Sequence, residues 1–316
     1  MKKILIILGW LIISMVSIAQ NTTFIVGKSI GYIESIQKAI NKASNGDIIH
    51  IKEGVYKENL KIINKNLKIV GESPNVWIKT KPLKSYSIKY PNIFIENSRV
   101  EFNDLSIFAT NTTAIIAIDS TVILKNMEIV LGENSIGIFT DSTDSATKIH
   151  NSVVIFNVRI NGAKKTKPVN SSQQITLFNN RGIITKGKTR LDVYKSHFSY
   201  LQVGISAMNK KTIISNSKFS NNIVGLVLSD GNYLIVSNTF QTIDRGIILM
   251  GKSKSEFLYN SFIENNIDIF ILQRICNSCP HSKQFIGNIE GIFNYSKDEF
   301  VILPENFDLP DYFIGK

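Results

Sequence analysis

Cysteine is scarce in this chain of 316 residues: the only two are Cys276 and Cys279, in the segment CNSCPH. In an oxidising compartment, a pair this close predicts one local disulfide. The segment is not a haem attachment site, because Pro280 separates Cys279 from His281. A metal site would need further ligands, and the nearby sequence offers none. We therefore expect no bound metal and no cofactor.

A long apolar run is missing except at the N-terminus, where residues 4–16 follow two lysines. Ser17-Ile18-Ala19 then places small residues at the two positions that an export peptidase reads. This pattern predicts a secretory signal peptide over residues 1–19, with Gln20 as the first mature residue. The alternative is an uncleaved anchor, which usually needs about 20 apolar residues. We expect export to the periplasm or the extracellular space, with no stable membrane insertion after cleavage.

Acidic residues are fewer than basic ones, with 25 Asp and Glu against 36 Lys and Arg. The chain stays basic after loss of the two lysines in the signal peptide. A basic exported protein can favour acidic polymers such as uronate polysaccharides, teichoic acids or lipopolysaccharide. Solubility explains the charge equally well. Export argues against nucleic acid as a partner.

The second half of the chain repeats with a constant period. A glycine followed by an apolar residue recurs at steps of 22, 21 and 21 residues, at Gly182, Gly204, Gly225 and Gly246. A phenylalanine series keeps the same period, at Phe198, Phe219, Phe240 and Phe262. A period of 20 to 50 residues indicates a solenoid or an array. The apolar runs within each period have the length of strands, so the unit is a coil of β-strands.

The chain before the repeats contains one predicted helix. Apolar residues recur at helical spacing over residues 32–44, and Asn45-Gly46 follows as a C-terminal stop. Short strands are expected over residues 48–51, 60–63 and 67–70. A stack of coils exposes a strand edge and an apolar core at each end, so we expect the helix to cap the N-terminal end.

The stretch over residues 33–71 resembles the opening of pectin methylesterases and of the wider pectin-lyase-like superfamily of right-handed parallel β-helices. The resemblance lies in IQKAINKA, GDIIHIKEGVYKENLKI and NLKIVG, about 40 residues of the chain. Its Gly-x-Tyr-x-Glu core is Gly54, Tyr56 and Glu58. Many β-helix proteins without esterase activity share this core, so the resemblance implies a fold more strongly than a reaction.

The catalytic motifs of these families are absent from the sequence. The esterases need two carboxylates within a few ångströms, one attacking the ester and one donating a proton. The sequence lacks their flanking pattern of aspartates between glycine and aromatic residues. It also lacks the Asn-Thr-Asp, Asp-Asp and Gly-His-Gly blocks of polygalacturonases. No motif matches the calcium-binding aspartates and catalytic arginine of pectate lyases either.

The predicted fold class is all-β, a single-stranded right-handed parallel β-helix forming one domain over residues 20–316. It should have roughly ten coils of about 21–23 residues over residues 46–272, with an irregular C-terminal cover over 273–316. Inward side chains should stack into columns along the axis. We expect the recurring asparagines to be turn residues and ladders between coils: Asn216, Asn238, Asn260, Asn221, Asn222, Asn265 and Asn266.

The candidate catalytic residues are Asp230, Asp244 and Arg245, since carboxylates and a guanidinium come near one another only there in the regular coils. Adjacent residues of a strand point to opposite faces, so a surface ion pair or a turn contact is the competing interpretation.

The candidate carbohydrate-binding residues are aromatic and cationic side chains in two places where the period fails. Aromatic rings stack on sugars, and lysines pair with uronate carboxylates. The competing interpretation is that the aromatics close an irregular coil and the lysines are solvated. The candidates are Trp77, Lys79, Lys81, Lys84, Tyr86 and Tyr90 in the segment over residues 77–90, and Lys164 and Lys165 in a polar loop over residues 161–174.

The sequence therefore favours an exported β-helix protein that binds carbohydrate or has a structural role in the cell envelope, without catalysis. The alternative is a polysaccharide lyase, glycoside hydrolase or carbohydrate esterase acting on an acidic glycan such as a uronate polymer.

Overall fold

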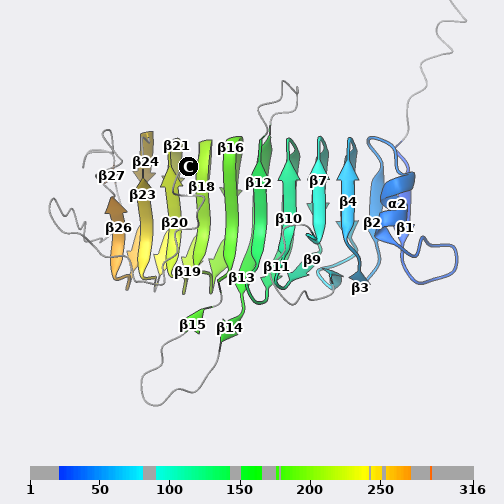
Figure 1. Cartoon of the computed structure of the whole chain (residues 1–316), viewed down its shortest axis with the longest axis horizontal. Coiled ribbons are helices and arrows are strands. Elements are labelled where there is room, and N and C mark those ends of the chain that lie inside the picture. Colours follow the sequence, from blue (N-terminus) through cyan, green and yellow to red (C-terminus); the bar gives the residue numbers. More distant parts are fainter. Residues whose placement is uncertain are drawn as a thin grey trace, which may run out of the picture.

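The protein is mostly β, with one long parallel sheet typical of a parallel β-helix (Figure 1). The computed structural model describes residues 21–80, 90–142, 151–165, 176–177, 179–241, 243–250, 254–271 and 285–286. The predicted signal peptide, both cysteines and nearly all of the predicted C-terminal cover lie outside these residues. Within them, the one helix is α2 (Ile36–Lys42), and 25 strands join in a single sheet.

The strands form three columns, each paired in parallel from one coil to the next. The first column contains β1 (Thr23–Val26), β2 (Ile48–Ile51), β5 (Asn66–Gly71), β8 (Arg99–Asn103), β11 (Thr121–Leu131), β13 (Ser152–Gly162), β16 (Arg181–Tyr194), β18 (Val203–Ser215), β21 (Asn232–Val236), β24 (Lys254–Leu258) and β27 (Phe285–Ile286).

The second column shares two long strands with the first. It contains β3 (Gly54–Lys57), β6 (Val76–Lys79), β9 (Ser106–Ala109), the C-terminal halves of β11 and β13, β17 (His197–Ser199), β19 (Lys218–Ser220), β22 (Thr239–Gln241) and β25 (Ser261–Ile263).

The third column contains β4 (Leu60–Ile63), β7 (Ile93–Glu96), β10 (Thr113–Ile118), β12 (Ile136–Asp141), the N-terminal halves of β16 and β18, β20 (Val224–Ser229), β23 (Arg245–Met250) and β26 (Ile267–Ile271). Apart from this sheet, β14 (Lys164–Lys165) and β15 (Thr176–Leu177) form a short antiparallel pair that projects from the stack (Figure 1).

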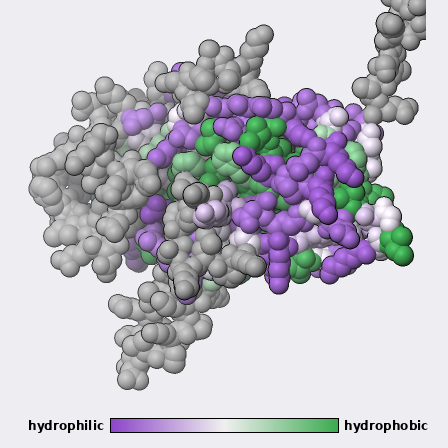
Figure 2. All heavy atoms as spheres, turned by 45° about the vertical axis from the view of Figure 1, so that its right-hand side comes forward, coloured by the Kyte–Doolittle hydropathy of each residue, from purple (hydrophilic) through white to green (hydrophobic). Residues whose placement is uncertain are grey.

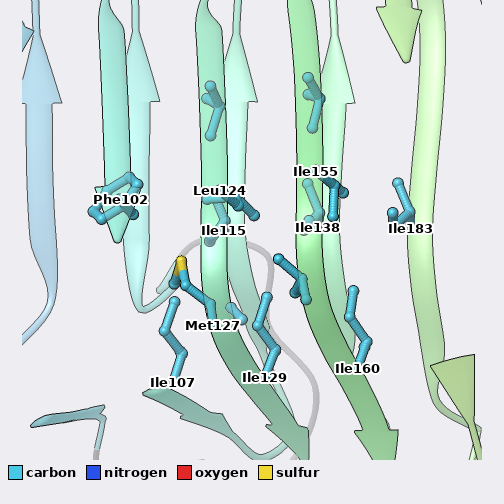
Figure 3. Close-up of a cluster of buried hydrophobic side chains, with 14 of the residues drawn as sticks. Phe102, Ile107, Ile115, Leu124, Met127, Ile129, Ile138, Ile155, Ile160 and Ile183 are labelled. Carbon is cyan, nitrogen blue, oxygen red and sulfur yellow. The ribbon is translucent and has the colours of Figure 1, made fainter. Parts of the chain in front are cut away.

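Inward side chains from the three columns meet in one apolar core, as the alternating pattern predicted. Figure 3 shows residues of the first column, such as Leu124 and Ile155, and of the third, such as Ile115 and Ile138, pointing into the same space. Each of these side chains is fully buried. Because the pairing is parallel and in register, each core position stacks on its equivalent in the next coil.

The phenylalanine series forms the predicted core column. Phe198, Phe219, Phe240 and Phe262 stack with ring centroids 4.9, 4.9 and 5.0 Å apart and planes within 12° of parallel. The first three are fully buried. The spacing equals the separation of hydrogen-bonded strands, so each coil contributes one ring to a continuous stack.

The repeating glycines are required by close approach between coils. A Cβ on Gly225 would lie 2.5 Å from the carbonyl oxygen of Gly246 and 2.9 Å from the ring of Phe240. Gly204 and Gly246 meet the equivalent atoms of their own next coils. Gly137 extends the series, because a Cβ there would lie 2.5 Å from the carbonyl oxygen of Gly182. A long insertion between these two hides that step in the sequence.

The recurring asparagines divide into two structural roles, one residue apart. Asn216 has a φ of 51° and turns the chain between the first and second columns, where Ser237 and Tyr259 have the same left-handed conformation. Asn238 and Asn260 come one residue later and are buried. The expected equivalence of Asn216 with these two is therefore wrong by one position.

The buried position after the turn forms a ladder of side chain to backbone hydrogen bonds along the stack. The backbone N–H of Ser217 donates to Asn238 Oδ1 (2.9 Å), and that of Asn238 donates to Asn260 Oδ1 (3.0 Å). Ser196 and Ser217 continue the ladder in the earlier coils through their hydroxyl oxygens. The ladder satisfies backbone donors that the corner would otherwise bury without partners.

The Gly-x-Tyr-x-Glu core has structural roles. Gly54 has a φ of 145°, which favours glycine, and the Tyr56 hydroxyl donates to the Lys52 carbonyl at 2.7 Å. The Glu58 carboxylate accepts from the backbone N–H groups of Ile36 and Gln37, both at 3.0 Å. Glu58 thus satisfies donors at the N-terminus of α2, where negative charge is favourable.

Helix α2 is shorter than the 13 residues predicted from the sequence. Ser35 is extended and caps the helix, accepting from the Lys38 N–H, while Ile33 forms a bridge to Val26. The residues before Ser35 therefore lie outside the helix, and Ile33 pairs with strand β1 instead. Among the described residues, no helix has the length and apolar character needed to span a membrane.

We predict that Glu58→Ala destabilises the fold by about 1–3 kcal/mol, since two backbone donors lose a charged acceptor. The matched control is Glu34→Ala, because Glu34 is exposed and forms only a long contact with Lys38. Urea unfolding of both variants measures the difference. Equal midpoints for the two variants would contradict the role of Glu58.

We predict that Gly225→Ala costs about 1–3 kcal/mol, because the methyl group would overlap backbone in the next coil. Lys218→Ala, at an exposed position on the preceding strand β19, should change stability little. Thermal unfolding followed by circular dichroism compares the two. A Gly225→Ala protein as stable as the parent would rule out the close approach.

Candidate functional site

The outward faces of the three columns differ in chemistry, and this difference locates the candidate site. The outward row of the third column is almost entirely apolar from β7 to β26, whereas its first position, on β4, is Lys61. Its members are Phe94, Ile116, Phe139, Ile184, Ser206, Val227, Ile248 and Phe270, paired in register. Figure 2 shows a lateral face on which hydrophilic residues border a hydrophobic area. Such a row offers no groups for acid–base or ionic chemistry.

The outward face of the first column carries several charges that form ion pairs. Lys125 Nζ lies 3.1 Å and Lys68 Nζ 3.8 Å from the Glu101 carboxylate. Burial tends to raise the pKa of Glu101, but hydrogen bonds from Asn103 and Lys125 outweigh it and hold that pKa below its ordinary value. Arg190 and Asp192 form a further pair at 2.8 Å. These ion pairs neutralise part of the charge on this face, which also carries the exposed Arg99 and Lys211.

The outward face of the second column instead brings ionisable groups of four successive coils into one row. Glu128 pairs in register with Arg159, Arg159 with His197, and His197 with Lys218. Neighbouring positions of such a row lie about 4.8 Å apart along the axis. Arg159 and Lys218 are exposed, and neither forms a salt bridge with any residue of the described ranges. We call these four residues the cationic row.

A second row of polar side chains lies two residues further along the same strands. Ser199 Oγ donates to Asn161 Oδ1 (2.8 Å), and Asn161 Nδ2 donates to Glu128 Oε1 (3.0 Å). Ser220 Oγ lies 2.7 Å from His197 Nε2. These bonds fix Glu128 and His197 while leaving the two longer cations extended toward solvent.

His197 is the most perturbed group of the cationic row. Burial lowers its pKa, and the positive charges of Lys218 and Arg159 lower it further. The imidazole is therefore neutral near pH 7, so the row carries two cations and one carboxylate in that state.

Trp77 and Lys79 lie at the N-terminal end of the same outward face, on β6. Lys79 Nζ is 4.8 Å from the Trp77 ring centroid and 5.5 Å from that of Phe108 on the adjacent strand. Such cation–π contacts hold the ammonium over the rings. Trp77 and Arg159 are three coils apart, about 14 Å along the axis.

The remaining predicted binding residues belong to two insertions between strands. The insertion containing Lys81, Lys84 and Tyr86 leaves from the C-terminal end of β6, and these three lie outside the described residues. Tyr90 closes this insertion and is 53% exposed. Lys164 and Lys165 form β14, which begins three residues after Asn161 of the polar row. Both insertions therefore leave the corner between the second and third columns, beside the cationic row.

The structure does not bring Asp230 near the other two candidate catalytic residues. Asp230 is a left-handed turn residue after β20, whereas Arg245 pairs with Val224 at the start of that strand, about 20 Å away along six residues. Asp244 and Arg245 are near neighbours, with carboxylate and guanidinium 3.9 Å apart. The Arg245 side chain is buried against the Phe270 ring, so the guanidinium of this ion pair is a packed group, whereas Asp244 is partly exposed.

Sequence reasoning missed the cationic row, although a signal was present. His197 and Lys218 each directly precede a phenylalanine of the repeating series, so they occupy one outward phase. Glu128 and Arg159 share this phase, but the insertions before β16 obscure their alignment. Within the described residues, no group of three or more His, Cys, Asp or Glu side chains is arranged to hold a metal ion.

Comparison with known proteins finds likeness in fold. The chain is similar to a pectin methylesterase solved in complex with a hexasaccharide (13% identity, TM-score 0.42, 86% of this chain and 94% of that chain). It is also similar to an alginate lyase from Paenibacillus sp. (13%, 0.41, 77% and 96%) and a polygalacturonase from Erwinia carotovora (9%, 0.32, 81% and 95%).

The matched structures include a pectin methylesterase, the kind of protein that residues 33–71 resemble in sequence. At these identities the likeness concerns the fold and assigns no reaction. No family model matches the sequence, and no curated protein matches it either.

We predict that the pKa of His197 in the folded protein lies below its ordinary value of 6.5. Lys218→Met should raise it, because one of the two neighbouring positive charges is removed. Lys211→Met, an exposed lysine on the first column, should leave it unchanged. NMR titration of the imidazole protons measures all three. A titration unaffected by Lys218→Met would contradict the geometry of the row.

Proposed function

We propose that this protein binds an acidic polysaccharide, such as a uronate polymer, along the outward face of the second column. The cationic row carries this proposal. Arg159 and Lys218 project from one face, two coils apart, and neither forms a salt bridge with another described residue. Lys57 and Lys79, paired in register nearer the N-terminus, extend the positive charge along the same face.

The physical basis is a match between a linear polyanion and a linear array of cations. Coils repeat at about 4.8 Å, so a chain lying along the axis can contact several side chains from different coils. Cations that project from low-dielectric walls attract such a ligand and speed its association. The half-buried Trp77 ring adds a surface on which a sugar can stack.

Export of the protein and closure of the N-terminal end of the coil are part of the same proposal. The N-terminal pattern supports a signal peptide over residues 1–19, and export supports a Cys276–Cys279 disulfide and a glycan partner. We propose a right-handed coil closed at its N-terminal end by α2, whose Ile36, Ala39 and Ile40 are buried in the core cluster. We propose the right-handed form because crossover connections between parallel strands strongly prefer that hand.

The test is binding of labelled polygalacturonate by the double variant Arg159→Gln/Lys218→Gln. Each exposed ionic contact is worth up to about 1 kcal/mol, so affinity should fall about three- to tenfold, with a weaker dependence on salt. The charge-matched control is Lys38→Gln/Lys211→Gln, which removes two exposed lysines elsewhere. Equal loss in both double variants would point to net charge alone and overturn the proposed face.

The same row supports the enzymatic alternative as a second candidate. Three successive coils contribute a carboxylate (Glu128), a guanidinium (Arg159) and a neutral imidazole (His197). Lyases and hydrolases of acidic glycans use side chains of these types. Release of unsaturated or reducing ends from polygalacturonate, lost in His197→Gln with binding at pH 7 retained, would establish this candidate. Purified protein that binds the polymer without product release would exclude it.

A further inference from the structure

We infer that His197 makes this face bind polyanions more tightly as the pH falls, adding a third cation between Arg159 and Lys218 only when it is protonated. This inference rests on the proposed function and names how the same site is regulated. The sequence contains four histidines, and among those in the described residues only His197 lies in the cationic row.

The neighbours of His197 on every packed strand favour this role. On the side of β13 its register partner is Arg159, and on the side of β19 it is Lys218. Ser220 lies 2.7 Å from Nε2 and can donate or accept, so it tolerates either protonation state. The nearest carboxylate in the row is Glu128, two coils away and hydrogen-bonded to Asn161.

The free protein disfavours the charged imidazole because a third positive charge would stand between two others in a half-buried position. A bound polyanion reverses this, since its carboxylates neutralise the flanking cations and attract the imidazolium. Binding therefore raises the pKa of His197, and the complex takes up a proton.

Linkage fixes the sign of the effect. If the complex holds more protons than the free protein, its affinity rises as the pH falls through the interval between the two pKa values of His197. The lower end of this interval is the pKa of the free protein, which burial, Lys218 and Arg159 place below 6.5. Above the interval the imidazole is neutral in both states, and affinity no longer depends on it.

The experiment measures the affinity of the full mature protein for polygalacturonate between about pH 7.5 and about pH 5, where uronate carboxylates stay ionised. Affinity of the parent should rise about three- to tenfold as the pH falls. His197→Gln should lose the rise, so that its affinity is the same at both ends of the pH range. His197→Arg should bind tightly at both pH values. Dextran sulfate, whose sulfates do not titrate here, repeats the series as a control for ligand ionisation.

The outcomes separate this inference from the proposed function. Binding that depends on Arg159 and Lys218 but shows the same pH dependence in parent and His197→Gln would overturn the role of His197 alone. Absence of binding to either polymer at any pH would overturn the proposed function and the inference with it. Thermal unfolding of both histidine variants at each pH verifies that the measured proteins are folded.

Discussion

Parallel, in-register hydrogen bonding between each coil and the next is the constraint on which the rest of this structure depends. It places equivalent residues of successive coils directly above one another, at about the spacing of paired strands. Residues at one coil position are therefore neighbours along the axis, so aromatic rings, glycines or charges that recur at that position form rows. The stacked rings from Phe198 to Phe262 and the glycines beside them both follow from this constraint.

The same constraint divides the surface into rows of distinct chemistry. The third column has a row of apolar residues outside as well as inside, and the first column has charges that pair between coils. Among the described residues, the second column lines up Arg159, His197 and Lys218 on three successive coils, with no carboxylate between them. A linear acidic polymer is the ligand whose geometry best fits such a row, which is why the proposed function and the proton-linked role of His197 concern one face.

Two residues that the sequence singled out, Glu58 and Arg245, have structural roles in the fold. Glu58, part of a motif shared with esterases, holds the N-terminus of a helix. Arg245 looked like a surface group but is buried against Phe270, because its strand is covered on both faces. Neither role is visible in sequence, since each depends on a partner 21 or more residues away that only coil closure brings close.

The sequence by itself determined the repeat, the strand character of each unit, the inward phenylalanines and the positions of β2 and β4, because these depend on local periodicity. It also determined that asparagines occupy the corners, although Asn216 and Asn238 proved to be one position apart in role. Only the tertiary structure decided which outward residues become neighbours. Insertions of unequal length change the sequence separation of stacked residues, so the register of Glu128 with Arg159 and of Arg159 with His197 depends on backbone pairing across those insertions.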